Sequence, residues 1–409
     1  MEAIVEHAAG LDVGQRTVVA TVLVGGPHRR PLKETRTFRT MTRDLVALRD
    51  WLVGMGITHV GMESTGVYWK PIYAILEGHV SELIIGNAQH IKNVPGRKTD
   101  VKDSEWLAEL VRHGLIAKSF VPPASIRQLR DLTRYRRKLV ESRTAERNRL
   151  LKLLETANIK LSSVASDVFG VSGMLMLRAL VEGATSPVEV AHLAKGKLRR
   201  KIQQLTWALE GRLEEHHRFI LRLQLRRLDL VDADLDALED EIGRRLDPYR
   251  AEHELLCQIP GVDGIIAAVI LAELGTDMTV FRSPEAAAAW AGVCPGNNQS
   301  GRRRRTERVR RGNVHLQSAL IEAAMAAACK KGSYLKAKYH RLRSRRGPKR
   351  AAMAIAHKIL IAAYHMLLNH CPFKDLGDRY LDSLDANRTT RTLVRRLERQ
   401  GYRVTLTAA

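Results

Sequence analysis

The chain has 409 residues, 45% of them hydrophobic, which is enough for two or three domains of ordinary size with buried cores. Its 67 lysines and arginines against 44 acids give a net charge of +23, which indicates a polyanionic partner, nucleic acid first. An anionic membrane surface fits less well, because the charge is spread over several segments instead of one amphipathic helix.

The cysteines indicate a reducing, cytoplasmic setting. The four cysteines form neither a CxxC pair nor a zinc spacing with histidine, so neither a disulfide framework nor a structural zinc site is indicated. The N-terminus lacks the pattern of a signal peptide. Residues 351–370 are strongly apolar but include His357, Lys358 and His365, which favours a buried helix over a membrane span.

The first 110 residues predict an α/β layer. Runs of small and β-branched residues indicate strands, and apolar residues at helical spacing indicate helices. Strands are expected within 8–24 (two of them), 30–40, 57–65 and 81–88, and helices within 42–56, 67–78 and 98–110. The order βββ-α-β-α-β-α predicts a mixed sheet.

The middle of the chain predicts long helices. Residues 122–159 read as one strongly basic helix. Apolar residues in steps of three and four from Leu198 to Ile242 predict a coiled coil or a long antiparallel hairpin, which ends at Pro248.

The last third is predicted to be mainly helical. "IPGVDG" between two apolar runs predicts a helix-hairpin-helix, and a glycine- and arginine-rich loop separates two later helices. The tail predicts a basic helix and a short strand at 402–407. The predicted division is 1–122, 123–248, 249–372 and a tail at 373–409.

Four acids are candidate metal ligands. Asp12 and Glu63 end predicted strands, and Asp100 and Asp103 lie three residues apart on one helix face, so all four can meet at a sheet edge. Together they would repel each other unless cations intervene. Two Mg²⁺ ions about 3.5–4 Å apart serve phosphodiester cleavage, and Mn²⁺ suits the same oxygens. The plainer interpretation makes each a turn, capping or ion-paired residue.

Ser300 and the arginines after it are a second candidate site. A serine hydroxyl beside several guanidinium groups can attack a phosphodiester. The alternative, favoured by spacing alone, is a loop that only grips a nucleic-acid backbone. The arginines concerned are Arg302, Arg303, Arg304, Arg305, Arg308, Arg310 and Arg311.

Further nucleic-acid contacts are predicted on helical segments. Gly261 and Gly264 of the hairpin can present backbone N–H groups to a phosphate. The basic helix is expected to lack matching acids at i,i+4, which favours a nucleic-acid contact over a merely solvated face. Its cations are Arg127, Arg130, Arg134, Arg136, Arg137 and Lys138. "EEHHR" at 214–218 is interpreted as surface, not as a metal site.

Six segments resemble the IS110-type transposases. "GLDVGQ", "GMESTGVYW" and "KTDVKDSEWLAEL" resemble the acidic motifs of the family's RuvC-like, RNase H-fold domain. "IPGVDGIIAAVILAELG", "FRSPEAAAAWAGVCPGNNQSG" and "RVRRGNVHLQSALIEAA" resemble its C-terminal transposase domain. The resemblance covers roughly residues 8–120 and 252–330, and it implies an α/β RNase H-like N-terminal domain and a mainly α-helical C-terminal domain.

The resemblance implies a DEDD-type DNA recombinase. Asp12, Glu63, Asp100 and Asp103 correspond to the metal-binding acids, and Ser300 corresponds to the family's nucleophilic serine. The implied partners are double-stranded donor and target DNA, a structured non-coding guide RNA, and further copies of the chain in a dimer or tetramer. Two departures are Asp263, where a glycine is usual, and a serine loop richer in arginine than usual.

Two other functions are kept open. One is a Holliday-junction-type endonuclease that uses the acids and water alone. The other is a nucleic-acid-binding scaffold with a degenerate acidic site, which would show no Mg²⁺-dependent cleavage.

Overall fold

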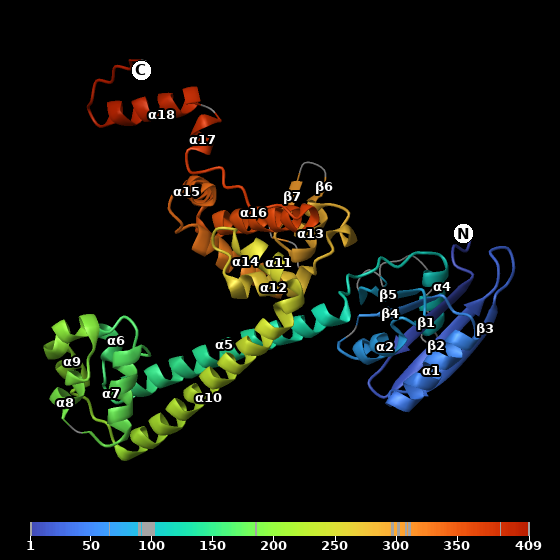
Figure 1. Ribbon diagram of the computed structural model, residues 1–409, viewed down its shortest axis with the longest axis horizontal. Coiled ribbons are helices and arrows are strands. Elements are labelled where there is room, and N and C mark those ends of the chain that lie inside the picture. The colour runs from blue at the N-terminus through green and yellow to red at the C-terminus, as the bar shows by residue number, and fades with distance from the viewer. Residues whose placement is uncertain are drawn as a thin grey trace. The chain divides into compact units, whose positions relative to one another are not determined.

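A computed structural model describes residues 2–64, 66–88, 91, 103–184, 186–295, 298–300, 303–306, 309, 312–384 and 386–407, without the side chains of 298–300, 303–306, 387–389 and 392. The chain divides into two compact units, Met1–Val121 and Pro122–Ala409 (Figure 1). We call them the N-terminal and C-terminal units. The further divisions predicted near 248 and 372 stay predictions.

The N-terminal unit is built on a mixed five-stranded sheet. Its strand order is β3-β2-β1-β4-β5, in which β1 pairs antiparallel with β2 and parallel with β4. The strands are β1 (His7–Val13), β2 (Thr17–Val24), β3 (Leu32–Arg39), β4 (His59–Glu63) and β5 (Glu82–Gly86). The helices are α1 (Thr42–Gly54), α2 (Trp69–Leu76) and α4 (Asp103–Arg112). The mixed sheet is confirmed, and the elements that the structure describes follow the predicted order.

Alternation along β1 sends its side chains to two different layers. Ala9 and Leu11 pack in one buried cluster with residues of α1 and α2. Ala8 packs in another cluster with Val111 of α4. Because side chains alternate across a strand, Gly10 and Asp12 belong to the face that α4 covers.

In the described part of the C-terminal unit, the regular elements are helices and one β-hairpin. Its hairpin consists of β6 (Asn298–Ser300) and β7 (Arg303–Thr306). Its first helices are α5 (Ala124–Thr156), α6 (Leu161–Val164), α7 (Val171–Val181), α8 (Pro187–His192), η1 (Gly196–Lys201), α9 (Ile202–Leu209), α10 (Glu215–Leu246) and η2 (Asp247–Tyr249). The others are α11 (Arg250–Cys257), α12 (Gly264–Leu274), η3 (Met278–Val280), α13 (Pro284–Ala291), α14 (Val314–Ala327), α15 (Tyr334–Arg346), α16 (Pro348–Asn369), α17 (Tyr380–Ser383) and α18 (Ala386–Arg399).

The long helices α5 and α10 lie side by side and run in opposite directions (Figure 1). Ion pairs from Arg136 to Glu239 at 2.6 Å and from Arg143 to Asp232 at 3.0 Å follow that antiparallel register. The apolar pattern from Leu198 to Ile242 is divided among η1, α9 and α10, because residues 210–214 interrupt it. Helix α10 pairs with α5 instead. The coiled coil itself stays a prediction.

Two expectations about short segments were wrong. Residues 402–407 form no strand, since they meet no pairing strand among the described residues. The segment predicted as a plain arginine-rich loop contains the β6–β7 hairpin instead. Alternating backbone hydrogen bonds overcome the poor strand propensity of this polar sequence.

Helix α16 is long and apolar enough to cross a membrane by length and composition, and more than half of its apolar window is buried. Its buried residues, such as Ile355, Ile359 and Leu360, lie within the helical packing formed with α13, α14 and α15. It is packed as the core helix expected from the sequence.

Candidate functional site

Asp12 and Glu63 lie at the ends of two neighbouring parallel strands. In the register of β1 and β4, Gly10 pairs with Gly61 and Leu11 pairs with Met62. Asp12 and Glu63 are the next residues on each strand. They therefore lie at the carboxyl edge of the sheet, Asp12 exposed and Glu63 half-buried.

Helix α4 brings Asp103 to the same edge. A Cβ atom on Gly10 would lie 2.2 Å from the carbonyl oxygen of Ser104, so the first turn of α4 touches β1 two residues before Asp12. The other end of α4 meets the start of β1, where Ile4 donates its backbone N–H to the carbonyl of Arg112 at 2.9 Å. The helix thus runs opposite to β1, and Asp103 begins it at the acidic edge.

A buried hydrogen bond fixes this first turn of α4. The hydroxyl groups of Thr21 on β2 and Ser104 on α4 lie 2.9 Å apart, and both residues are buried. The sheet and helix thereby bring together three of the four predicted ligands. Asp100 lies outside the described residues.

The donor set fits a hard divalent cation. Carboxylate oxygens are the ligands that Mg²⁺ and Mn²⁺ prefer. Asp12 and Asp103 are exposed, which leaves room for the waters that Mg²⁺ retains. Each of the three acids also has an interaction with other groups of the chain.

Ser300 is the last residue of β6. It pairs with Arg303, and a bridge between Pro295 and Val309 closes the base of the hairpin. The backbone of Arg303, Arg304 and Arg305 forms most of β7. Arg302, Arg308, Arg310 and Arg311 lie outside the described residues.

The turn between α11 and α12 is tightly packed at Gly261. Gly261 has φ +89°, and a Cβ atom there would lie 2.2 Å from the carbonyl oxygen of Ala323 in α14. Asp263 is the N-cap of α12 and accepts a hydrogen bond from the Ile266 backbone N–H at 2.8 Å. The aspartate that replaces the usual glycine thus has a capping role. Gly264 is exposed, and phosphate contact by this turn stays a prediction.

The cations predicted to bind nucleic acid on α5 have partners within the chain. Arg137 and Lys138 both bind Glu141. The premise that the basic helix lacks matching acids at i,i+4 was therefore wrong at Arg137. Arg136 binds Glu239, and the guanidinium group of Arg127 donates to the carbonyl of Pro122 at 2.9 Å. These partners compete with a nucleic acid for the same side chains.

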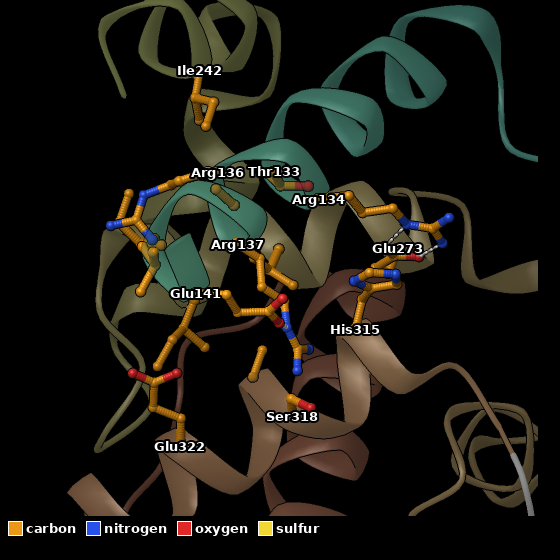
Figure 2. Close-up of a pocket in the computed structure, with 16 residues that line it drawn as sticks. Thr133, Arg134, Arg136, Arg137, Glu141, Ile242, Glu273, His315, Ser318 and Glu322 are labelled. Atoms are coloured by element: carbon orange, nitrogen blue, oxygen red, sulfur yellow. Dashed lines mark hydrogen bonds and ion pairs between the residues drawn. The ribbon is translucent and has the colours of Figure 1, made fainter. Parts of the chain in front are cut away.

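Arg130 and Arg134 converge on Glu273, a carboxylate with no exposed side-chain surface. Arg134 donates to both carboxylate oxygens, at 2.7 and 2.8 Å (Figure 2). The amide of Asn313 donates to the same carboxylate at 2.6 Å. This cluster was not predicted from the sequence, although a single acid inside the apolar run 264–274 was a signal that it needed a buried partner.

A cavity of about 280 Å³ adjoins this cluster. Figure 2 shows Arg134, Arg137, Glu273 and His315 around it. The Nδ1 atom of His315 is buried without a hydrogen-bond partner among the described residues. Burial, and then the charge of Arg134, lowers the pKa of His315, so the imidazole is neutral at pH 7.

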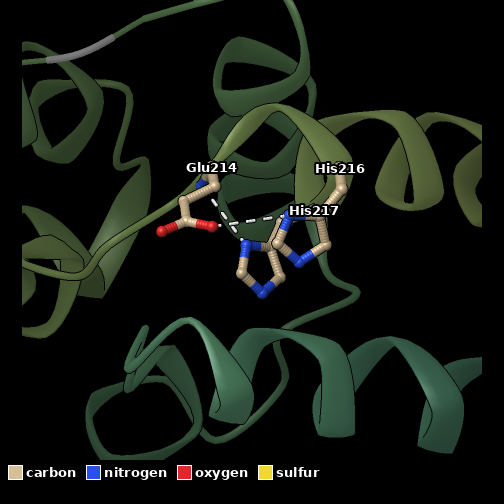
Figure 3. A group of neighbouring side chains, drawn as sticks. All are labelled: Glu214, His216 and His217. Atoms are coloured by element: carbon tan, nitrogen blue, oxygen red, sulfur yellow. Dashed lines mark hydrogen bonds and ion pairs between the residues drawn. The ribbon is translucent and has the colours of Figure 1, made fainter.

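Glu214, His216 and His217 form the cluster with the spacing of metal ligands (Figure 3). His217 Nδ1 accepts the Glu214 backbone N–H at 3.2 Å, which completes a capping box at the start of α10. This hydrogen bond places the ring proton of neutral His217 on Nε2. Neither ring nitrogen is then available to a metal without breaking the cap, and the surface interpretation is the better one.

A second feature that was not predicted from the sequence is a long segment without acids. Between Glu322 and Asp375 the sequence contains no aspartate or glutamate, and α15 and the start of α16 lie within it. Exposed cations there include Arg343, Arg346 and Lys349, none with an acid partner in the described chain. Counting acids along the sequence would have revealed it.

Comparison with known proteins identifies the class. A model of DEDD transposases of the IS110 group matches residues 9–159, and a model described as "Transposase IS116/IS110/IS902 family" matches residues 253–340. With the mixed sheet and its acidic edge, these matches define a DNA transposase of the DEDD class.

More particularly, the chain belongs to the IS110 family of transposases. It is 26% identical to a "Probable family 20 transposase" of Pseudomonas aeruginosa over 283 residues, 68% of this chain and 74% of the relative. It is 28% identical to the "Insertion element IS900 uncharacterized 42 kDa protein" of Mycobacterium paratuberculosis over 326 residues, 71% of this chain and 80% of the relative.

Proposed function

We propose that this transposase cuts and rejoins DNA strands with a divalent-metal site formed by Asp12, Glu63, Asp100 and Asp103 and with Ser300 as nucleophile. The observation that carries the proposal is the register of β1, β4 and α4, which gathers three of these acids at one edge and one face of a sheet. Mg²⁺ bound there would supply positive charge to the scissile phosphate.

The residues of the chain would act as follows. The acids would hold the cation, which would supply positive charge beside the scissile phosphate. The arginines of the β6–β7 hairpin neutralise charge that develops on the phosphate oxygens. The Ser300 hydroxyl attacks phosphorus, loses its proton to solvent, and forms a P–O bond as the bond to one deoxyribose oxygen breaks. That oxygen takes up a proton. A strand-end hydroxyl reverses these steps on a new strand, so no ATP is needed.

We further propose that double-stranded DNA is held partly by the acid-free segment from α14 to α16. Arg343 and Arg346 lie in the last turn of α15, where cations also suit the helix dipole. Lys349, in contrast, lies in the first turn of α16, where a cation opposes the dipole. Its position is better explained by an anionic partner than by helix stability.

Guidance by a structured non-coding RNA, assembly into a dimer or tetramer, and location at the bacterial nucleoid complete the proposal. RNA guidance and oligomeric assembly rest on the family resemblance, with the basic composition as physical support. Purification of the full chain with its native flanking DNA tests guidance, because one discrete RNA should copurify with it. Recovery of recombination without any RNA would contradict guidance.

Two substitutions test the chemistry. Asp12→Asn should reduce Mg²⁺-dependent cleavage at least about 100-fold, the usual cost of removing one charge-stabilising group. Ser300→Ala should abolish both strand joining and the covalent protein–DNA adduct. Asp234→Asn, at an exposed acid on α10 of the C-terminal unit, is the control that should leave both activities unchanged.

The same variants separate the alternatives. Normal cleavage by Ser300→Ala would show a water-dependent nuclease of the junction-resolving kind. Absence of Mg²⁺-dependent cleavage by the unaltered protein, with DNA binding retained, would show a scaffold instead.

A further inference from the structure

Glu273 connects three segments of the C-terminal unit that are far apart in sequence. It lies in the last turn of α12 with no exposed side-chain surface. Arg134 of α5 donates two hydrogen bonds to its carboxylate. The Nε atom of Arg130 lies 3.3 Å from the Oε2 atom of the same carboxylate. Arg130 also donates to the backbone carbonyls of Ala272 and Glu273, each at 2.9 Å, and thereby closes the end of α12.

The third partner, Asn313, follows the β6–β7 hairpin that contains Ser300 and is the N-cap of α14. Its side-chain amide donates to Glu273 at 2.6 Å. Its side-chain oxygen accepts the backbone N–H groups of His315 and Leu316, at 3.1 and 3.2 Å, and so caps α14. One side chain therefore fixes both the start of α14 and the exit of the hairpin.

The neighbouring backbone has little room to move. A Cβ atom on Gly312 would lie 2.3 Å from the backbone nitrogen of Gly292, at the end of α13. The Asn313 backbone N–H donates to the carbonyl of Trp290 at 3.0 Å, and Gln317 donates to the carbonyl of Gly292. The chain before the hairpin, at Trp290 and Gly292, is thus held against the chain after it, at Gly312 and Asn313, next to Glu273.

The charge of Glu273 is maintained by its partners. Burial alone raises the pKa of this carboxyl, but the hydrogen bonds from Arg134 and the charges of both arginines outweigh it, so the pKa lies below its usual range. Burial lowers the pKa of Arg130 to about 10, which leaves the guanidinium charged at neutral pH. An apolar residue of similar volume often stabilises a core as well as such an ion cluster does. A contribution to folding stability alone therefore does not explain why these charged residues are present.

We propose that Glu273 is a positioning residue for strand exchange, which holds the hairpin of Ser300 through its hydrogen bond with Asn313 and braces it against α5. This inference rests on the proposed role of Ser300. Its physical basis is that a nucleophile must be held close to its reacting position, and that a misplacement of about 1 Å costs on the order of 100-fold in rate.

Glu273→Gln in the full chain is the first test. Glutamine keeps the shape but removes the charge and one acceptor oxygen. The single-turnover rate of covalent adduct formation should fall about 10- to 100-fold, while the Kd for DNA changes by less than about twofold, because the hairpin arginines are retained. Hydrogen exchange of backbone amides at 298–306 and 312–318 should accelerate, with α7 and α9 unchanged.

A reciprocal exchange separates positioning from general loss of structure. Asn313→Asp keeps the cap of α14 but places a carboxylate against Glu273, and it should be as slow as Glu273→Gln. The double variant Glu273→Gln with Asn313→Asp restores a carboxylate–amide hydrogen bond at unchanged net charge. It should regain most of the missing rate and protection.

Glu239→Gln, which removes the acid of the half-exposed ion pair with Arg136, is the matched control and should keep the rate of the unaltered protein. An unaltered rate in Glu273→Gln would overturn the inference, as would a double variant no better than the single ones. Ser300→Ala distinguishes the two proposals: if it still forms the adduct, the proposed function fails, whatever Glu273 does.

Discussion

Gly10 illustrates at the scale of one residue how the acidic edge is built. Any side chain at this position would strike the backbone of Ser104 and Ala108 in α4. The absence of a side chain lets α4, which begins at Asp103, approach β1 two residues before Asp12. The strand propensity of glycine is poor, so the close approach explains its presence within β1.

Gly10→Ala should therefore destabilise the N-terminal unit by at least about 1–3 kcal/mol, the usual range for an overpacked core. Cleavage should fall as well, because α4 must shift. Urea unfolding followed by far-UV circular dichroism measures the first effect. Gly54→Ala, at a helical glycine with nothing within 4 Å of the added Cβ, is the control, and its stability should change by less than about 1 kcal/mol. Equal effects of the two substitutions would contradict this packing role of Gly10.

His315 gives a pH-dependent prediction. The groups around it are Arg134, Arg137 and Lys138 on α5 and Glu273 on α12. Folding lowers the pKa of His315, so at acidic pH the folded state binds fewer protons than the unfolded state. The free energy of unfolding therefore falls as the pH drops below the usual histidine range. Urea midpoints at about pH 7.5 and about pH 5.5 measure this loss. His315→Gln should reduce the loss, and His340→Gln, at an exposed position of α15, should not. Identical pH profiles for His315→Gln and the unaltered protein would contradict the prediction.

At the scale of elements, the two glycines of the turn between α11 and α12 are predicted to have different roles, one in packing and one in phosphate contact. Gly261 has positive φ and no room for a Cβ atom, whereas Gly264 is exposed and has only the His253 ring within 4 Å of an added Cβ. Gly261→Ala should destabilise the C-terminal unit by more than about 1 kcal/mol. Gly264→Ala should leave stability nearly unchanged and weaken DNA binding. Unfolding midpoints and DNA titrations of both variants measure this, and full DNA affinity in Gly264→Ala would remove the turn from the DNA interface.

The elements that the sequence predicted well are those with a strong local pattern. Apolar spacing located α1, α4 and α5, and β-branched runs located β1 and β2. The partner of α10 was not predictable, because helix pairing depends on contacts between α5 and α10, some 80 residues apart at their closest ion pairs. The hairpin strands β6 and β7 were missed because polar, arginine-rich residues give no strand signal.

In the candidate site, too, features that depend on local patterns were predicted and those that depend on long-range contacts were not. Strand ends at Asp12 and Glu63 followed from local patterns, and the register of β1 and β4 placed them side by side. The buried role of Glu273 depended on arginines from α5, about 140 residues away, so no local pattern announced it. Long-range contacts also explain why cations of the basic face expected on α5, such as Arg134 and Arg136, form ion pairs within the chain.

At the scale of the whole molecule, the net charge of +23 predicts DNA binding that weakens steeply with salt. Arg343, Arg345 and Arg346 on α15 are exposed, and replacing all three with glutamine should lower the slope of log K against log salt by about 0.9 for each phosphate that is no longer neutralised. Filter binding at several salt concentrations measures the slope. The control replaces Arg244, Arg245 and Arg250 with glutamine, which removes an equal charge. These arginines are paired with Glu241 and Asp247, so the slope of log K against log salt should change less. Equal slopes in the two triple variants would remove α15 from the interface.

The most direct measurement is anomalous diffraction from crystals of the full chain with DNA, soaked in MnCl₂ and recorded at the manganese edge. We predict manganese within about 2.0–2.6 Å of carboxylate oxygens of Asp12 and Glu63, with Asp100 and Asp103 completing the site. Manganese bound only elsewhere, for instance at Glu214 and His216, with the β1–β4 edge free of metal, would contradict a catalytic metal site at these acids.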